Sequence, residues 1–67
     1  MSYCVEMIRV NSTAIRAVGY DGYTLYVEFL TGQTYEHPRV PYSEFCNLLN
    51  ADSKGGYYSR HIRGKYR

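Results

Sequence analysis

The chain has 67 residues and a formal net charge of +2, which suits one domain and is too short for a two-domain enzyme. Hydrophobic residues make up 45% of it, but nine of them are Tyr and only 16 are Val, Ile, Leu, Met or Phe. A domain with so small an aliphatic core usually needs a covalent or metal cross-link, or a partner subunit. We therefore expect a single domain over residues 1–67 that forms a homo-oligomer.

Cysteine content and hydropathy indicate the compartment. Cys4 and Cys46 are too few for a disulfide framework, and no charged segment followed by an apolar run indicates export. No apolar stretch approaches the roughly 20 residues needed to cross a bilayer. We expect a cytoplasmic protein with no membrane partner.

Charge is divided unevenly along the chain. Residues 1–52 hold three arginines against six acidic residues, a net charge of −3, whereas residues 53–67 hold five basic residues and no acid, a net charge of +5. Such asymmetry indicates an anionic partner such as a nucleic acid or nucleotide. The alternative is a solvated basic end with no partner.

A hairpin is the best-defined local element. Asp21-Gly22 separates two β-favouring segments, 15–20 and 23–30, and this dipeptide is typical of a two-residue type I′ turn. In the second segment alternate residues share one face, which we expect to belong to the core. These residues are Tyr23, Leu25, Val27 and Phe29.

Two further strands complete the predicted sheet. Residues 5–10 have the apolar character of a short strand, and Thr31-Gly32 forms a second turn into a strand over 33–37. Pro38 ends that strand because proline cannot donate to a β-ladder. The sequence therefore predicts an antiparallel meander of three to four strands.

The periodicity then changes to a helical one. Pro41 suits a helix start, and apolar residues follow at helical spacing to about residue 50. A cap at Asp52 or Ser53 begins a second helix that runs to about residue 63, with Tyr58 and Ile62 facing the core. The predicted fold class is α+β, a small antiparallel β-meander covered by two short C-terminal helices.

The start of the second helix is a candidate phosphate site. Gly55 and Gly56 each cost about 1 kcal/mol relative to Ala in a helix, so a reason other than helix propensity is required for them. A helix start presents unpaired N–H groups, and glycines let an anion approach them. The alternative is that the two glycines form a loose turn between helices. The P-loop pattern GxxxxGK[ST] is absent.

Basic and aromatic side chains follow that start. Arginine and lysine can bind phosphate oxygens and tyrosine rings can stack on a base, a combination that indicates a nucleotide. We expect Arg60 and Arg63 to contribute most of the affinity. The candidate ligand-binding residues are Ser53, Lys54, Gly55, Gly56, Tyr57, Arg60, His61, Arg63, Lys65, Tyr66 and Arg67.

Across nearly all its length the chain resembles the KTSC domain, a module named for its occurrence at the C-terminus of some lysyl-tRNA synthetases. The likeness lies in residues 10–15, 18–21, 25–29 with Gly32, 40–41 and 53–63. It implies an α+β fold, a suspected affinity for RNA, and no catalytic residues. The family's central Tyr-X-Tyr reads Tyr35-Glu36-His37 here, so any role of its second tyrosine is not carried over.

The residues themselves do not indicate an enzyme. Cys4, Cys46, His37 and His61 show neither CxxC nor HxxxH spacing, so we expect no metal site, no cofactor and no Cys–His nucleophile. His37, directly before a proline, is either a turn residue or a ligand contact. We expect a binding protein.

Three binding functions are open. The first is sequestration of a small nucleotide, cyclic or linear, in a pocket shared by subunits of a homo-oligomer, as in phage proteins that counter nucleotide-based bacterial defence. The second is an RNA-binding module with an extended basic surface. The third is a protein-interaction module. Glycines at a phosphate position and surplus tyrosines for an interface favour the first.

Overall fold

The computed structural model describes residues 6–66, so Cys4, Arg67 and the first residue of the predicted 5–10 strand lie outside the described residues. The four strands are β1 (Met7–Arg9), β2 (Ile15–Tyr20), β3 (Leu25–Phe29) and β4 (Thr34–His37). They form one antiparallel sheet in the order β1-β2-β3-β4. This confirms the predicted meander.

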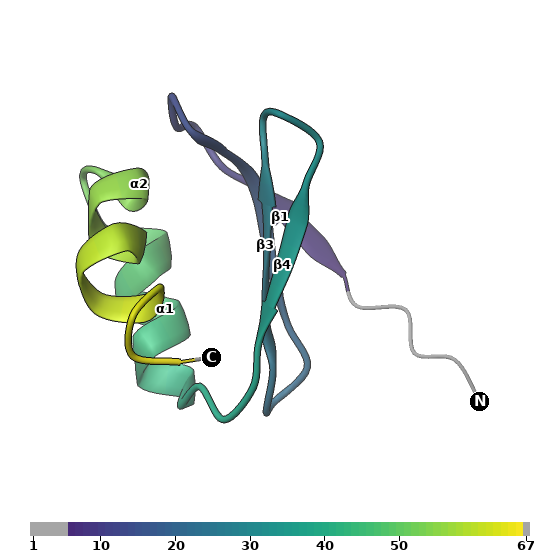
Figure 1. The fold of residues 1–67 in the computed structure, drawn as a ribbon, viewed down its shortest axis with the longest axis vertical. Coiled ribbons are helices and arrows are strands. Elements are labelled where there is room, and N and C mark those ends of the chain that lie inside the picture. Colours follow the sequence, from purple (N-terminus) through teal and green to yellow (C-terminus); the bar gives the residue numbers. More distant parts are fainter. Residues whose placement is uncertain (1–5, 67) are drawn as a thin grey trace.

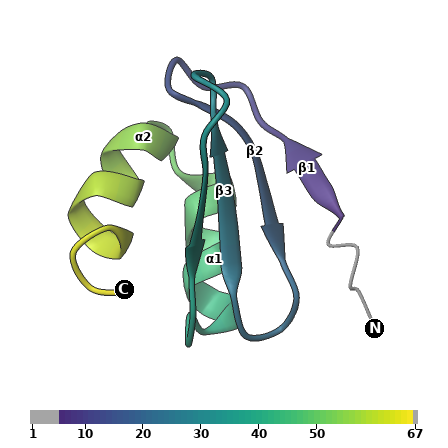
Figure 2. The ribbon, with the colours of Figure 1, turned by 45° about the vertical axis from the view of Figure 1, so that its right-hand side comes forward.

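Helices follow the sheet in the chain and cover one of its faces, as Figures 1 and 2 show. They are α1 (Tyr42–Asn50), α2 (Lys54–Tyr57) and a π-helical segment, η1 (Tyr58–Ile62), that continues α2. The α+β fold class is therefore confirmed. In the described part of the chain no helix is long and apolar enough to cross a bilayer.

Strand register decides which side chains face the helices. Leu25 pairs with His37 and Val27 with Tyr35 across β3 and β4. Because directly paired residues project to the same side of a sheet, β4 contributes Tyr35 and His37 to the face that Leu25 and Val27 occupy. The predicted core face is confirmed at Leu25 and Val27, which are fully buried, and at Phe29, which packs against the core.

The predicted type I′ turn at Asp21-Gly22 is wrong. Four residues join β2 to β3, and among them only Gly22 has a positive φ, of 97°. The Asp21 carboxylate accepts hydrogen bonds from the backbone N–H groups of Tyr23 at 2.9 Å and Thr24 at 2.7 Å, which closes the wider loop. Tyr23 consequently precedes β3 and is 54% exposed, so its predicted place on the core face is also wrong.

The hydrophobic core lies between the sheet and the helices. Fully burying a Val, Leu, Ile or Phe side chain contributes roughly 1.5–3 kcal/mol, so this cluster is the main source of stability. Tyr58 and Ile62 belong to it, as predicted, with exposed fractions of 5% and 0%. The buried members are Ile15, Val18, Leu25, Val27, Val40, Phe45, Leu48, Tyr58 and Ile62.

The last helix begins as predicted and then departs from α-helical geometry. The Ser53 hydroxyl accepts a hydrogen bond from the Gly56 N–H at 3.2 Å, so Ser53 is the cap. From Tyr58 onward the turn widens, and the Arg63 N–H donates to the Tyr58 carbonyl, five residues back, at 2.9 Å. Such π-helical turns contain an extra residue. Here the widened turn brings Arg63 next to Tyr58.

Gly55 and Gly56 lie inside α2, so the alternative of a loose turn between helices is wrong. A Cβ at position 55 would lie 3.2 Å from the Cβ of Ala14, and a Cβ at position 56 would lie 2.9 Å from the capping Ser53 Oγ. Close approach between α2 and the loop before β2 therefore explains Gly55 without a ligand.

That contact yields a prediction for Gly55→Ala. Alanine should gain up to about 1 kcal/mol of helix propensity, but crowding against Ala14 should cancel the gain. In an Ala14→Gly background the crowding is gone, and Gly55→Ala should stabilise the fold. Urea unfolding of the four proteins in a double-mutant cycle measures the coupling. Equal effects in both backgrounds would show that the contact is unimportant.

Candidate functional site

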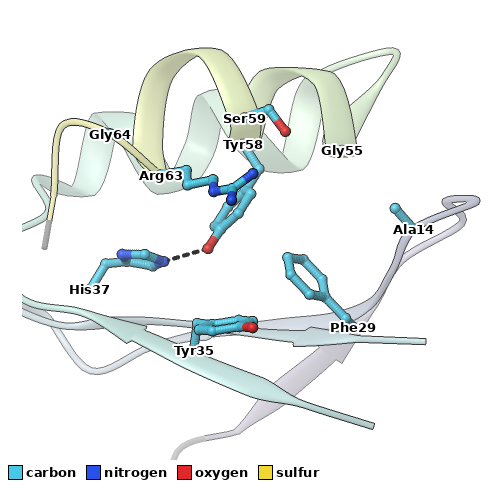
Figure 3. Close-up of a pocket in the computed structure, with 9 residues that line it drawn as sticks. All are labelled: Ala14, Phe29, Tyr35, His37, Gly55, Tyr58, Ser59, Arg63 and Gly64. Carbon is cyan, nitrogen blue, oxygen red and sulfur yellow. Dashed lines mark hydrogen bonds between the residues drawn. The ribbon is translucent and has the colours of Figure 1, made fainter. Parts of the chain in front are cut away.

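A cleft of about 730 Å³ opens between the sheet and the last helix. Figure 3 shows aromatic side chains of the sheet on one side of it and the helical residues on the other. Its lining residues come from five parts of the chain, and one of them, Arg63, is a cation. They are Ala14, Phe29, Tyr35, His37, Gly55, Tyr58, Ser59, Arg63 and Gly64.

Three aromatic rings give the cleft its apolar surface. Phe29 meets the edge of Tyr58 with ring centroids 5.2 Å apart and planes at 90°, and it lies 5.4 Å from Tyr35 at 57°. Tyr35 is 43% exposed, and its hydroxyl donates to the Gln33 side-chain oxygen at 2.8 Å. The Tyr35 ring is therefore held in place with part of its surface free.

His37 joins the sheet to the end of the chain. It is buried, with 7% of its surface exposed, and both of its ring nitrogens form hydrogen bonds. Nδ1 lies 2.6 Å from the Tyr66 carbonyl oxygen, and Nε2 lies 2.7 Å from the Tyr58 hydroxyl. Within residues 6–66 no group of three or more His, Cys, Asp or Glu is placed to hold a metal ion. His37 is thus a hydrogen-bonding group at the end of β4, and not a turn residue.

The Tyr58 hydroxyl stays protonated over a wide pH range. Burial raises the pKa of Tyr58, the neighbouring Tyr35 raises it further, and the charge of Arg63 acts in the opposite direction. Burial disfavours the charged phenolate and dominates here. The cleft therefore presents a neutral hydroxyl beside a guanidinium.

A smaller polar recess of about 240 Å³ lies next to α2. Of the predicted ligand residues it contains Ser53, the helix cap, and Lys54, whose ammonium donates to the Ala51 carbonyl at 3.0 Å. These two side chains are thus already used within the fold. The lining residues are Asn11, Ser12, Thr13, Asp52, Ser53 and Lys54.

Two other predicted ligand residues, Tyr57 and Tyr66, form hydrogen bonds to α1, and two more lie against their rings. The hydroxyls of Tyr57 and Tyr66 both donate to the carboxylate of Glu44, the latter at 3.1 Å. His61 packs on the Tyr57 ring with centroids 4.4 Å apart, and the Lys65 ammonium lies 5.5 Å from the centre of the Tyr66 ring. The hydroxyls of Tyr57 and Tyr66 therefore attach the last segment of the chain to α1.

Gly56 lies within α2 and does not line the cleft, and the remaining predicted residues of the described chain divide between the cleft and the surface. Gly55 and Arg63 line the cleft, whereas Arg60 is exposed and donates from Nε to the Gly56 carbonyl at 3.3 Å. Arg67 lies outside the described residues. The structure thus brings together two of the predicted residues and adds seven that were not in the predicted set. The added residues are Ala14, Phe29, Tyr35, His37, Tyr58, Ser59 and Gly64.

The fold and this cleft define a class of protein, a two-layer α+β domain in which helices close one face of an antiparallel meander. The family model for the KTSC domain matches residues 11–66. The chain therefore belongs to the KTSC domain family. A KTSC domain protein from Yersinia pestis has the same fold, with a TM-score of 0.90 and 30% sequence identity over 96% of this chain and 93% of that one.

Sequence relatives include lysine–tRNA ligases. The chain is 33% identical over 63 residues to the ligase of Nostoc punctiforme, which covers 91% of this chain and 11% of the ligase. It is 43% identical over 44 residues to the ligase of Trichormus variabilis, covering 66% and 8%. The chain thus spans about a tenth of the length of these ligases.

The contacts with Glu44 predict a pH effect. The hydrogen bond to Glu44 is the main cause that raises the pKa of Tyr57, and burial adds to it. Well below pH 10 Tyr57 is neutral in both folded and unfolded chains. As pH rises toward the folded pKa, the unfolded chain loses its phenolic proton first, so stability falls. In Glu44→Gln this fall should be shallower, as thermal unfolding between pH 8 and 11 can measure.

Proposed function

We propose that this KTSC domain binds a small phosphorylated nucleotide in the cleft between the sheet and the last helix. The observation that carries the proposal is the position of Arg63, a cation among the aromatic rings of one concave surface. A ligand that satisfies both features has a planar ring and an anionic group. A volume of about 730 Å³ is in the range of small-molecule sites.

The two parts of a nucleotide match different parts of the cleft. A guanidinium can bind phosphate oxygens through two parallel hydrogen bonds, which assigns the phosphate to Arg63. Aromatic faces bind bases by stacking, worth about 1–3 kcal/mol per base, which assigns the base to the region of Tyr35 and Phe29. The other exposed basic residues of η1 and its C-terminal side lie outside the cleft. With a single arginine among the described residues of the cleft, the expected ligand carries one or two phosphate groups.

Binding without turnover is the role that these side chains suit. A general base needs a free nitrogen or oxygen within reach of the substrate. Both ring nitrogens of His37 are engaged in hydrogen bonds within the fold, and the Tyr58 hydroxyl is one of the partners. The cleft therefore suits retention of a ligand, which agrees with sequestration of a nucleotide signal, cyclic or linear.

RNA binding is the second candidate, and the similarity to part of the lysine–tRNA ligases favours it. In this alternative the cleft takes one nucleotide of a strand, and exposed basic residues such as Arg60 and Lys65 contact neighbouring phosphates. Affinity for a strand falls steeply with salt because many counterions are released, whereas a small nucleotide with few charges gives a shallow dependence.

Arginine substitutions test the location of the site. Arg63→Ala should weaken binding of mononucleotides and cyclic dinucleotides by roughly 10- to 100-fold, since a charge-assisted hydrogen bond contributes about 1.5–3 kcal/mol. Arg60→Ala removes the same charge from the exposed surface of the same segment and is the matched control, with a change below about threefold expected. Isothermal titration calorimetry measures both.

Two results would count against this assignment. Equal losses in both variants would indicate a diffuse basic surface. Tight, steeply salt-dependent binding of a short single-stranded RNA, with no binding of small nucleotides, would replace the first candidate by the second. Circular dichroism of each variant establishes that the fold is intact.

A homo-oligomer is part of the first candidate. Several large hydrophobic side chains are exposed, among them Tyr35 at the cleft, and a second copy that covered Tyr35 would enclose the ligand. Light scattering on a sizing column should therefore give a multiple of 7.8 kDa. A mass near 7.8 kDa throughout the micromolar range would remove the shared pocket from the proposal.

A further inference from the structure

The hydrogen-bond partners of His37 determine which of its ring nitrogens carries the proton. Nδ1 lies 2.6 Å from the carbonyl oxygen of Tyr66. A carbonyl oxygen only accepts hydrogen bonds, so Nδ1 must carry the hydrogen and donate it. In neutral histidine the other nitrogen, Nε2, is then an acceptor.

The same logic fixes the hydroxyl of Tyr58. Its oxygen lies 2.7 Å from Nε2 of His37, and an acceptor nitrogen requires a donor opposite it. With the ring neutral and its hydrogen on Nδ1, the Tyr58 O–H group donates to His37. Among the described residues this is the hydrogen bond that the Tyr58 hydroxyl makes, and burial keeps the hydroxyl protonated by raising its pKa.

The free side of the Tyr58 oxygen is thereby left with lone pairs only. Tyr58 lines the cleft, and Figure 3 shows its oxygen next to His37, between the helix and the aromatic side chains of the sheet. A group that meets this oxygen from the cleft must be a donor. A ligand carbonyl or a ring nitrogen without hydrogen would face another acceptor there. It would lose its hydrogen bond to water without replacement, which costs binding free energy.

We propose that His37 sets Tyr58 as a hydrogen-bond acceptor, so that the cleft selects ligands whose ring carries an N–H donor on its edge, such as the exocyclic amine of adenine. This inference rests on the proposed function and adds the class of base to it. His37 is a positioning residue in this scheme, since it acts on the ligand through Tyr58.

A pair of mononucleotides that differ in one amino group tests the selection. Adenosine 5′-monophosphate carries the exocyclic amine, and purine riboside 5′-monophosphate lacks it. The parent protein should bind the first roughly tenfold more tightly, as expected for a hydrogen bond of about 1.4 kcal/mol. In Tyr58→Phe that ratio should fall to about one. NMR titration measures both affinities even when binding is weak.

Tyr26→Phe is the matched control. It removes a tyrosine hydroxyl that donates to Asp21 and does not line the cleft, so the ratio of the two affinities should stay near tenfold. A ratio near one in the parent protein would overturn the selection and leave nucleotide binding standing. Binding of neither nucleotide to the parent would overturn the proposed function and the selection with it.

The protonation of His37 can be observed without a ligand. In ¹⁵N-labelled protein near neutral pH, the ring of His37 should show a hydrogen on Nδ1 and a bare Nε2. A ring with the hydrogen on Nε2 would make Tyr58 a donor toward the cleft and would overturn the inference, whatever the binding data show.

Discussion

A buried chain of hydrogen bonds from the Tyr66 carbonyl through His37 to the Tyr58 hydroxyl joins the sheet to the last helical segment. Polar groups in a core cost about 1–3 kcal/mol each when they lack partners, so these three must stay together. Because His37 of β4 must keep its hydrogen bond to Tyr58 of η1, the distance between β4 and η1 is fixed. The cleft lies beside this connection, since His37 and Tyr58 both line it.

Backbone packing acts on the same segment from its other end. Gly55 lets α2 approach the loop before β2. A Cβ atom built at position 55 would lie 3.2 Å from the Cβ of Ala14. The π-helical turn that follows brings Arg63 beside Tyr58. The last helix is thus held at its start by close packing of Gly55 against the Ala14 side chain, and further on by buried hydrogen bonds. The Gly55 contact and the buried hydrogen bonds together set the direction of this helical segment, and so the position of Arg63 at its end.

The basic end of the chain performs more than one task in this structure. Lys54 binds a carbonyl at the end of α1, Lys65 lies near the ring of Tyr66, and Arg63 alone of the described cations lines the main cleft. Tyr57 and Tyr66 use their hydroxyls on Glu44. A net charge of +5 over residues 53–67 therefore does not mean five equivalent ligand contacts.

Local regularities of the sequence were enough to predict the meander and α1, and they limited the helix cap to Asp52 or Ser53, of which Ser53 is the cap in the structure. Alternation over 25–29, helical spacing over 42–50 and a capping hydroxyl act between near neighbours, so short segments express them. The loop after β2 was mispredicted because the Asp21 side chain closes a longer loop than the dipeptide implies.

The cleft depended on the tertiary structure. Tyr35 and His37 are opposite Val27 and Leu25 in the register of β3 and β4, and continued alternation along 33–37 was the signal that could have placed them on the inner face. Their meeting with Tyr58 and Arg63 had no such signal. His37 contacts residues 21 and 29 positions away, and contacts of that separation arise only when helix and sheet pack, because packing and not periodicity selects which side chains share a buried space.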